Sequence, residues 1–393
     1  MNHLDHKFRS LNHRRIILFR KWRMAILKLV LDQRIVPIAY KSESSHKLAA
    51  GLLLPIEKPM RILILRTDGK LGDSITASYL IQGLRLHYQN KVHITVLSGP
   101  EFKPIFKGLV DDYIPLKINF LKSIKFILST NSHFEILINS SHILNPSSIV
   151  LSRFIRATRK MVMLNSRWKL FSDHVNFDVN HDHITKRYDA ILKLISTKPI
   201  PPLTYSYQLD TQAIERVKIQ LAEIKIKNNY EKLIVVNSFA GARRRNFNLD
   251  TTKTLIQLLA AAHPHSLIVS LANPGDLKIL RQWALEIKSP QWMFFNVGDL
   301  DFNAALIDRC DVVISPDTSI VHLACALNKK LVAVYRQDFG VEKNMKIWGP
   351  LNPNAIVVIA PKISFAEEDG DINSVNVSDI VTAVTKLLTT LPN

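Results

Sequence analysis

Short apolar runs with almost no charge recur along this chain, and a stretch of helix-like pattern follows most of them. RILILR (61–66) is the clearest example, because it is wholly apolar between its two arginines. A strand that is buried on both faces gives such a run, since neither of its sides meets water. Runs of this kind alternating with helices predict an α/β fold with parallel sheets. The runs lie at 61–66, 92–98, 134–140 and 160–164, and then at 232–238, 266–272, 292–297, 311–315, 330–335 and 355–360.

A proline-rich stretch divides these runs into two groups. STKPIPPLTYSYQL (196–209) holds three closely spaced prolines and has no helical period. Proline restricts both itself and the residue before it, so the stretch is typical of a linker. We therefore expect two Rossmann-like domains, 60–200 and 201–393. Ligands of such sheets bind at the carboxyl ends of the strands, so the expected active site is a cleft between the two domains.

The segment 1–59 differs in composition from the rest of the chain. It carries twelve Lys and Arg against four Asp and Glu, within a total of 52 against 33 and a net charge of +19. We expect a basic N-terminal helical extension whose apolar stripe includes Phe19, Ile26 and Val30. Such a helix suits an anionic membrane surface. It also suits packing on the folded body with its basic face in water, and the sequence leaves both alternatives open.

Cysteine content and hydropathy limit the compartment. The longest uncharged apolar run near the start, 48–56, is far shorter than the roughly 20 residues of a membrane-spanning helix. Cys310 and Cys325 are too few for a disulfide framework and lack the spacing of metal ligands. We expect a cytoplasmic protein without metal or cofactor. The excess positive charge predicts an anionic partner, but no basic stripe interleaved with aromatic residues indicates nucleic acid.

The loop RTDGKLGDS (66–74) follows the first apolar run. Gly69 and Gly72 permit a tight turn at the predicted cleft, with Lys70 between them. Asp73 then stands at the start of a helix, where it either caps the helix, worth about 1 kcal/mol, or accepts a proton from a hydroxyl nucleophile. The loop is neither a dinucleotide fingerprint nor a Walker loop, because the required glycine and GK[ST] spacings are missing.

The loop NSFAGARRRNF (237–247) follows the first run of the second group. Its three consecutive arginines, Arg243 to Arg245, come directly after a turn of small residues. Runs of charge on loops are usually only solvated. At the end of a strand, however, guanidinium groups suit a diphosphate because they donate paired hydrogen bonds.

The segment SPDTSIVHLACAL (315–327) follows another run. Asp317 precedes Thr318 and Ser319 at the start of a helix, where backbone amides favour an anion. His322 lies one turn further along the same face. A single helical histidine is more often a structural residue than a ligand, but its place beside the Pro-Asp-Thr-Ser turn favours a functional role.

Taken together, these segments resemble glycosyltransferase family nine, the ADP-heptose lipopolysaccharide heptosyltransferases. RILILRTDGKLGDSITASYLIQGLR is similar to the family's opening strand, Gly-Asp loop and helix, and CDVVISPDTSIVHLACALNKKLVAVY is similar to its second-domain motif. The similarity covers about 60–355. Two departures stand out: Ser319 replaces a common glycine, and Asn246-Phe247 replaces a common Trp-Pro pair.

The resemblance implies a GT-B-type fold and an inverting, metal-independent transfer of heptose from ADP-heptose to the inner core of lipopolysaccharide or lipooligosaccharide. The acceptor-binding domain would be 60–200 and the donor-binding domain 201–393. Asp73 would be the general base, Arg245 or its neighbour Arg243 would contact the donor phosphate, and Asp276 would contact the ribose. The other implied donor-binding residues are Asp317, Thr318, Ser319 and His322.

The implied acceptor is a lipid A-linked sugar at the inner face of the cytoplasmic membrane, so we expect peripheral membrane association. Two Asp-x-Asp triplets, at 299–301 and 369–371, lie away from predicted strand ends, and we interpret them as surface or capping carboxylates. The same motifs also suit another nucleotide-sugar in surface polysaccharide synthesis, because they address the nucleotide diphosphate. A non-enzymatic protein that binds anionic surfaces leaves the Gly-Asp loop and the Pro-Asp-Thr-Ser turn unexplained.

Overall fold

The computed structural model describes most of the chain from residue 59 onward and part of one earlier helix. Contacts between residues divide the chain into two compact units. The first comprises 1–70, 80–177 and 187–201, and the second comprises 71–79, 178–186 and 202–393. The described residues are 24–25, 28, 30–32, 59–117, 119–129, 132–141, 144–163, 168–175, 182–196, 199–337, 344–361 and 370–390.

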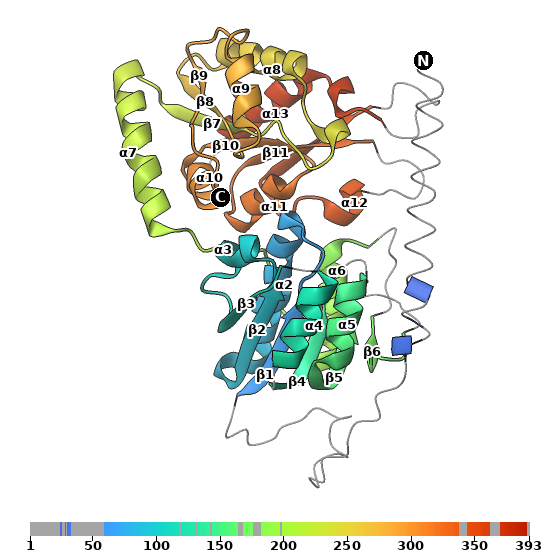
Figure 1. The fold of residues 1–393 in the computed structure, drawn as a ribbon. Helices are drawn as coiled ribbons and strands as arrows, with labels where there is room; N and C mark the ends of the chain where they lie inside the picture. The colour runs from blue at the N-terminus through green and yellow to red at the C-terminus, as the bar shows by residue number, and fades with distance from the viewer. Residues whose placement is uncertain are drawn as a thin grey trace, which may run out of the picture. The chain divides into compact units, whose positions relative to one another are not determined.

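The first unit contains a six-stranded parallel sheet in the order β3-β2-β1-β4-β5-β6 (Figure 1). Its central strand β1 is buried from Ile62 to Leu65, as its uninterrupted apolar sequence predicts. The strands are β1 (Met60–Leu65), β2 (Val92–Ser98), β3 (Asp112–Pro115), β4 (His133–Asn139), β5 (Arg156–Val162) and β6 (Asp173–His174). The helices are α2 (Leu71–Tyr88), α3 (Lys103–Phe106), α4 (Phe120–Ser129), α5 (Pro146–Phe154) and α6 (Ile184–Ile195).

The second unit repeats this topology in a second six-stranded parallel sheet, ordered β12-β11-β10-β7-β8-β9. The buried cluster on one face joins this sheet to α8 and α13, through residues such as Leu255 and Val384. The strands are β7 (Lys232–Val236), β8 (Ser266–Ser270), β9 (Trp292–Phe294), β10 (Val312–Pro316), β11 (Leu331–Arg336) and β12 (Ala355–Ala360). The helices are α7 (Thr211–Asn228), α8 (Leu249–Ala262), α9 (Leu277–Trp283), α10 (Leu300–Arg309), α11 (Ser319–Ala326), α12 (Asn344–Trp348) and α13 (Val377–Thr389).

Each sheet has one point where the strand order reverses. In the first it lies between β1 and β4, and in the second between β7 and β10. Loops leaving two strands at such a point diverge to opposite faces and leave a crevice at the carboxyl edge, where ligands of α/β sheets bind. The segments singled out from the sequence (66–74, 237–247 and 315–327) leave β1, β7 and β10, so all three begin at a reversal point.

The predicted α/β class with two sheets is confirmed, and ten of the twelve strands match the apolar runs to within a few residues. β3 and β6 were not predicted. β3 is four residues long with its ends exposed, and β6 has only two residues, so neither produces a continuous apolar run. Residues 199–209 of the predicted linker have no regular secondary structure.

The described part of the N-terminal helix packs on the first unit. Met24 and Leu31 contact a buried cluster that contains Trp168. The Asp32 carboxylate accepts a hydrogen bond from the Leu170 amide at 3.2 Å. For this stretch the packed-helix alternative is therefore the observed one. Val30, from the predicted apolar stripe, is 60% exposed and does not belong to this packed side, and Phe19 and Ile26 lie outside the described residues.

Among the helices that the structure describes, none combines the length and the apolar character needed to cross a bilayer.

Candidate active site

The side chain of Asn237 links the end of β7 to the end of β10 by hydrogen bonds. This buried residue follows β7, and its amide group donates to the Ser315 hydroxyl and the Thr318 hydroxyl, both at 3.1 Å. It also donates to the carbonyl of Phe239, at 3.0 Å, which shapes its own loop. A single side chain therefore ties together two loops that are about 80 residues apart in the chain. Asn237 was not among the predicted site residues, although it is the first residue of the predicted loop 237–247.

The Pro-Asp-Thr-Ser turn forms the beginning of α11. Thr318 is the N-cap residue, and its hydroxyl accepts the Ile320 amide at 3.1 Å. This hydroxyl therefore caps the helix as well as accepting from Asn237. The Ser319 amide, at the first helical position, has no hydrogen-bond acceptor within the described ranges. An amide at this end of a helix carries partial positive charge, so it can bind an anion.

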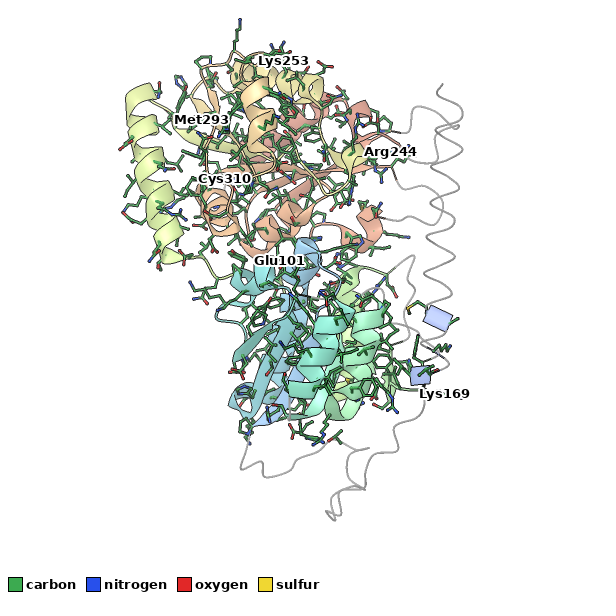
Figure 2. All side chains as sticks on the ribbon, in the orientation of Figure 1. Glu101, Lys169, Arg244, Lys253, Met293 and Cys310 are labelled. Carbon is green, nitrogen blue, oxygen red and sulfur yellow. The ribbon has the colours of Figure 1, made fainter. Side chains whose placement is uncertain are left out.

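Arg245 is the arginine that faces this helix start. One of its terminal nitrogens lies 3.0 Å from a carboxylate oxygen of Asp317 and 3.3 Å from the Asp317 carbonyl. Asp317 is buried, whereas the Arg245 side chain keeps 31% of its surface exposed, so the guanidinium is oriented but still accessible. Arg243 and Arg244 lie on the same short 3₁₀ turn as Arg245, and both are exposed; Arg244 is labelled in Figure 2.

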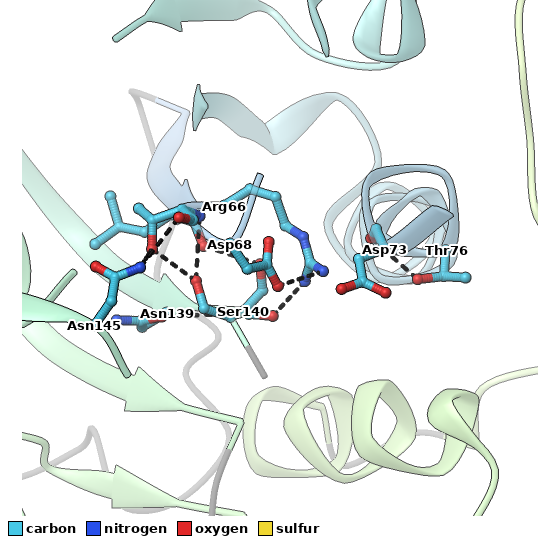
Figure 3. Close-up of polar contacts among 10 residues, drawn as sticks. Arg66, Asp68, Asp73, Thr76, Asn139, Ser140 and Asn145 are labelled. Carbon is cyan, nitrogen blue, oxygen red and sulfur yellow. Dashed lines mark hydrogen bonds and ion pairs between the residues drawn. The ribbon is translucent and has the colours of Figure 1, made fainter. Parts of the chain in front are cut away.

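Asp73 occupies the third position of α2 and is 6% exposed. The N-cap residue is Lys70, so Asp73 does not have the capping role considered for it above. Its carbonyl accepts a hydrogen bond from the Thr76 hydroxyl at 3.0 Å (Figure 3). Gly69 has a φ of +65°, a conformation that favours glycine, and the chain passes from there through Lys70 into the helix.

Gly72 brings the first turn of α2 against the start of α11, within the second unit. A Cβ atom at this position would lie 3.0 Å from the His322 ring and 3.3 Å from the Ser319 Cα. A Cβ atom at residue 72 would therefore fit only if these neighbours shifted by a few tenths of an ångström. Asp73 is the next residue on this first turn of α2.

The Gly72→Ala variant is expected to lower the free energy of unfolding by about 1–3 kcal/mol, because the added methyl meets a backbone atom and a confined ring. Urea unfolding checks this. Gly370→Ala is the matched control, since a Cβ there meets nothing within 4 Å and its φ is not positive. Equal stability of the two variants would contradict the close approach.

His322 is confined by aromatic rings. The centroids of Tyr205 and Trp348 lie 5.7 and 6.0 Å from the centroid of the His322 ring, both edge-on. Burial, and then the nearby His183, lower the pKa of His322 to about 3, so the imidazole is neutral at physiological pH. Its Nδ1 makes no hydrogen bond within the described residues. The described surroundings thus hold His322 as a packed, uncharged ring.

Stability is expected to fall in mild acid because of His322. Below its ordinary pKa of 6.5 the unfolded chain binds a proton that the folded chain does not bind until about pH 3, so unfolding becomes easier as pH falls between these values. The loss is about 2–3 kcal/mol between pH 7 and roughly pH 4.5. His322→Phe keeps a ring but does not titrate, so urea midpoints of this variant should depend less steeply on pH. Parallel profiles for the two proteins would contradict the argument.

The remaining predicted carboxylates are placed as follows. Asp276 follows β8 at the start of α9, and its carboxylate accepts from the Asn273 amide and side chain at 3.2 and 2.9 Å. In the Asp-x-Asp triplets, Asp299 caps α10 and Asp371 caps a 3₁₀ turn, which confirms their interpretation as capping residues. Asp301 accepts the Tyr207 hydroxyl at 2.8 Å, and Asp369 lies outside the described residues.

The first unit holds a pocket of about 480 Å³ at its own reversal point. Arg66, fully buried, forms its inner wall, where it donates to Asp68 at 2.8 Å and to the Ser140 carbonyl (Figure 3). Asn145 caps α5 beside it and also donates to Thr67 at 3.1 Å. Gly69, from the predicted cleft loop, lines the pocket. The full lining is Arg66, Thr67, Asp68, Gly69, Gly99, Glu101, Phe102, Lys117, Asn145, Pro146 and Ser147.

The lining of this pocket includes charged side chains of both signs. Asp68 and Glu101 contribute carboxylates, and Arg66 and Lys117 contribute cations. Several hydrogen-bonding groups around a space of this size suit a polyhydroxylated ligand. The loop at Gly69 was predicted from the sequence, but the pocket residues that follow β2 and β4, such as Glu101 and Asn145, were not.

Comparisons with known proteins identify the family of this chain. The family model of glycosyltransferase family 9 (heptosyltransferase) matches residues 130–370, which is more than half of the chain and includes both predicted donor loops. The chain belongs to glycosyltransferase family 9. It is therefore an enzyme of glycosyl transfer.

Individual relatives of this family 9 enzyme are distant. A protein of Escherichia coli K12, provisionally named lipopolysaccharide heptosyltransferase 4, is 23% identical over 78% of this chain and 83% of its own length. A family 9 glycosyltransferase from Veillonella parvula has a similar structure, with a TM-score of 0.70 and 16% identity over 84% of this chain and 97% of that one. The structure of E. coli ADP-heptose lps heptosyltransferase II is also similar, with a TM-score of 0.65 and 17% identity over 84% of this chain and 98% of that one. These likenesses confirm the two-domain GT-B-type architecture.

Proposed function

We propose that this family 9 enzyme transfers a heptose from ADP-heptose to a lipid A-linked sugar of the lipopolysaccharide or lipooligosaccharide inner core, with inversion and without a metal ion. The observation that carries the proposal is the close packing of Gly72 on Ser319 and His322. This packing brings the Gly-Asp loop against the start of α11, which supports assigning the Asp73 carboxylate and the helix end to one proposed site.

The second unit supplies the groups that a nucleotide diphosphate requires. Arg245 offers its accessible guanidinium, Asp317 orients that guanidinium, and Ser319 offers a backbone amide. Asp276, on the loop after the neighbouring strand β8, is the proposed ribose contact. The donor class is supported by solved structures of E. coli heptosyltransferase WaaC with ADP and with ADP-2-deoxy-2-fluoro heptose.

In the proposed reaction the oxygen of the acceptor hydroxyl attacks the anomeric carbon, and Asp73 accepts the proton of that hydroxyl. The bond from that carbon to the diphosphate breaks on the opposite side, so one displacement inverts the configuration. The electron pair leaves with the diphosphate oxygen. Arg245 and the α11 helix end meet this growing negative charge, and groups fixed before the reaction stabilise such charge most effectively.

We propose the pocket of the first unit as the place of the acceptor sugar. Its carboxylates and side-chain amide suit hydroxyl groups, and Arg66 and Lys117 suit an acidic substituent. The loop 66–70 that lines it leads directly into the helix turn of Asp73. We further propose that the enzyme works in the cytoplasm, at the inner face of the cytoplasmic membrane, where a lipid-linked acceptor is found.

Transfer of heptose from ADP-heptose to a truncated lipopolysaccharide acceptor tests the proposal, with UDP- and GDP-sugars as alternative donors. We expect transfer from ADP-heptose alone and inhibition by ADP. Turnover of another nucleotide-sugar in its place would leave the family assignment intact and overturn the donor. Binding of no nucleotide would overturn the assignment of the second unit's site.

A further inference from the structure

The first unit exposes two leucines on α4. Leu121 and Leu128 are 78% and 82% exposed, the highest values among the large apolar residues that the structure describes. They are seven residues apart, so they lie on the same side of the helix two turns apart. The opposite side faces the core, because Ser123 is fully buried and Ile127 packs against a buried cluster. The leucines therefore mark the outer side of a helix whose inner side is already packed.

Positive charge lies on the same side of α4. Lys122 and Lys125 are exposed between the two leucines, and neither pairs with a carboxylate within the described residues. The neighbouring helix α5 (Figure 1) ends in Arg153 and in Phe154, which is 52% exposed. Neither helix contains an Asp or Glu. We call this surface the α4–α5 face; it comprises Leu121, Lys122, Lys125, Leu128, Arg153 and Phe154.

We propose that the α4–α5 face docks on the surface of an anionic lipid bilayer. Apolar side chains among cations are typical of interfacial helices, in which the apolar groups enter the boundary of the acyl chains and the lysines reach the phosphates. A protein partner fits less well, because the centres of protein interfaces are depleted in lysine and here lysines stand between the leucines. The face belongs to the folded first unit and does not include the basic segment 1–59. It does not depend on the proposed reaction.

Co-sedimentation of the full-length protein with vesicles tests the face without any substrate. Phosphatidylcholine vesicles with and without phosphatidylglycerol are compared. Leu121→Ser/Leu128→Ser and Lys122→Glu/Lys125→Glu are each expected to weaken binding to the anionic vesicles at least about tenfold. Leu285→Ser is the matched control, because Leu285 is 75% exposed on the second unit, next to Glu286. Equal sedimentation of wild type and both double variants overturns the proposal.

A fluorescent probe locates the contact directly. The protein has two cysteines, Cys310 and Cys325, and both are buried, so a cysteine introduced at Leu128 is selectively labelled. An environment-sensitive dye at Leu128→Cys is expected to shift to the blue on anionic vesicles, and the same dye at Leu285→Cys is not. Sedimentation of the protein without a shift at position 128 means that another surface binds the bilayer, which also overturns the proposal.

Discussion

The Asp73→Asn enzyme is expected to transfer heptose at least about a hundredfold more slowly than the wild type while binding ADP with unchanged affinity. An amide has nearly the same size as the carboxylate but cannot accept the proton of the attacking hydroxyl, and loss of a general base typically costs 10²–10⁴ in rate. Asp73 is 6% exposed beside the packed Gly72, so an isosteric change keeps the helix turn in place. Single-turnover rates at saturating donor, together with ADP titration, measure the two effects separately.

Asp250→Asn is the matched control for this experiment. Asp250 also stands in the first turn of a helix, α8, but it is exposed. If acidic residues in first turns act only by stabilising their helices, both variants should behave alike. A normal rate for Asp73→Asn would remove the base from the proposed mechanism and leave the donor site unaffected.

Replacement of Arg245 is expected to cause the second large effect. Arg245→Ala should lower kcat/KM by about 10²–10³ and weaken ADP binding, because the guanidinium that meets the diphosphate charge is lost. Arg245→Lys should recover only part of this, since an ammonium cannot reproduce the two-point contact of a guanidinium. Steady-state kinetics over donor concentration and calorimetric titration with ADP measure both effects.

The same measurements determine which of the three arginines acts. Arg243 and Arg244 are exposed, and the structure gives neither of them the Asp317 contact that orients Arg245. Their alanine variants are expected to remain within about threefold of the wild type, as is usual for exposed charges. A larger loss for Arg243→Ala than for Arg245→Ala would show that the diphosphate binds one turn away from α11.

The fold could be predicted from local pattern because parallel strands buried on both faces carry an unmistakable signal. β2 and β12 match the predicted runs residue for residue. The apolar pattern does not reveal strands that are only partly buried, such as β3. It also does not show which side of the N-terminal helix is packed. There the sequence offered an apolar stripe through Val30, but Met24 and Leu31 make the contact. When several faces of a helix carry apolar residues, only the partner surface decides which one is buried.

The sequence by itself determined the two parallel-sheet units, the loops at their strand ends and the family to which the motifs belong. Strand order was decided by the tertiary structure, because pairing of β7 with β10 joins segments far apart in the chain. That pairing brings Arg245 to Asp317 and lets Asn237 tie both loops together. The tertiary structure also gives the reason for Gly72. The sequence shows that a glycine is present, but the constraint on it is a close approach to Ser319 and His322, which no local pattern records.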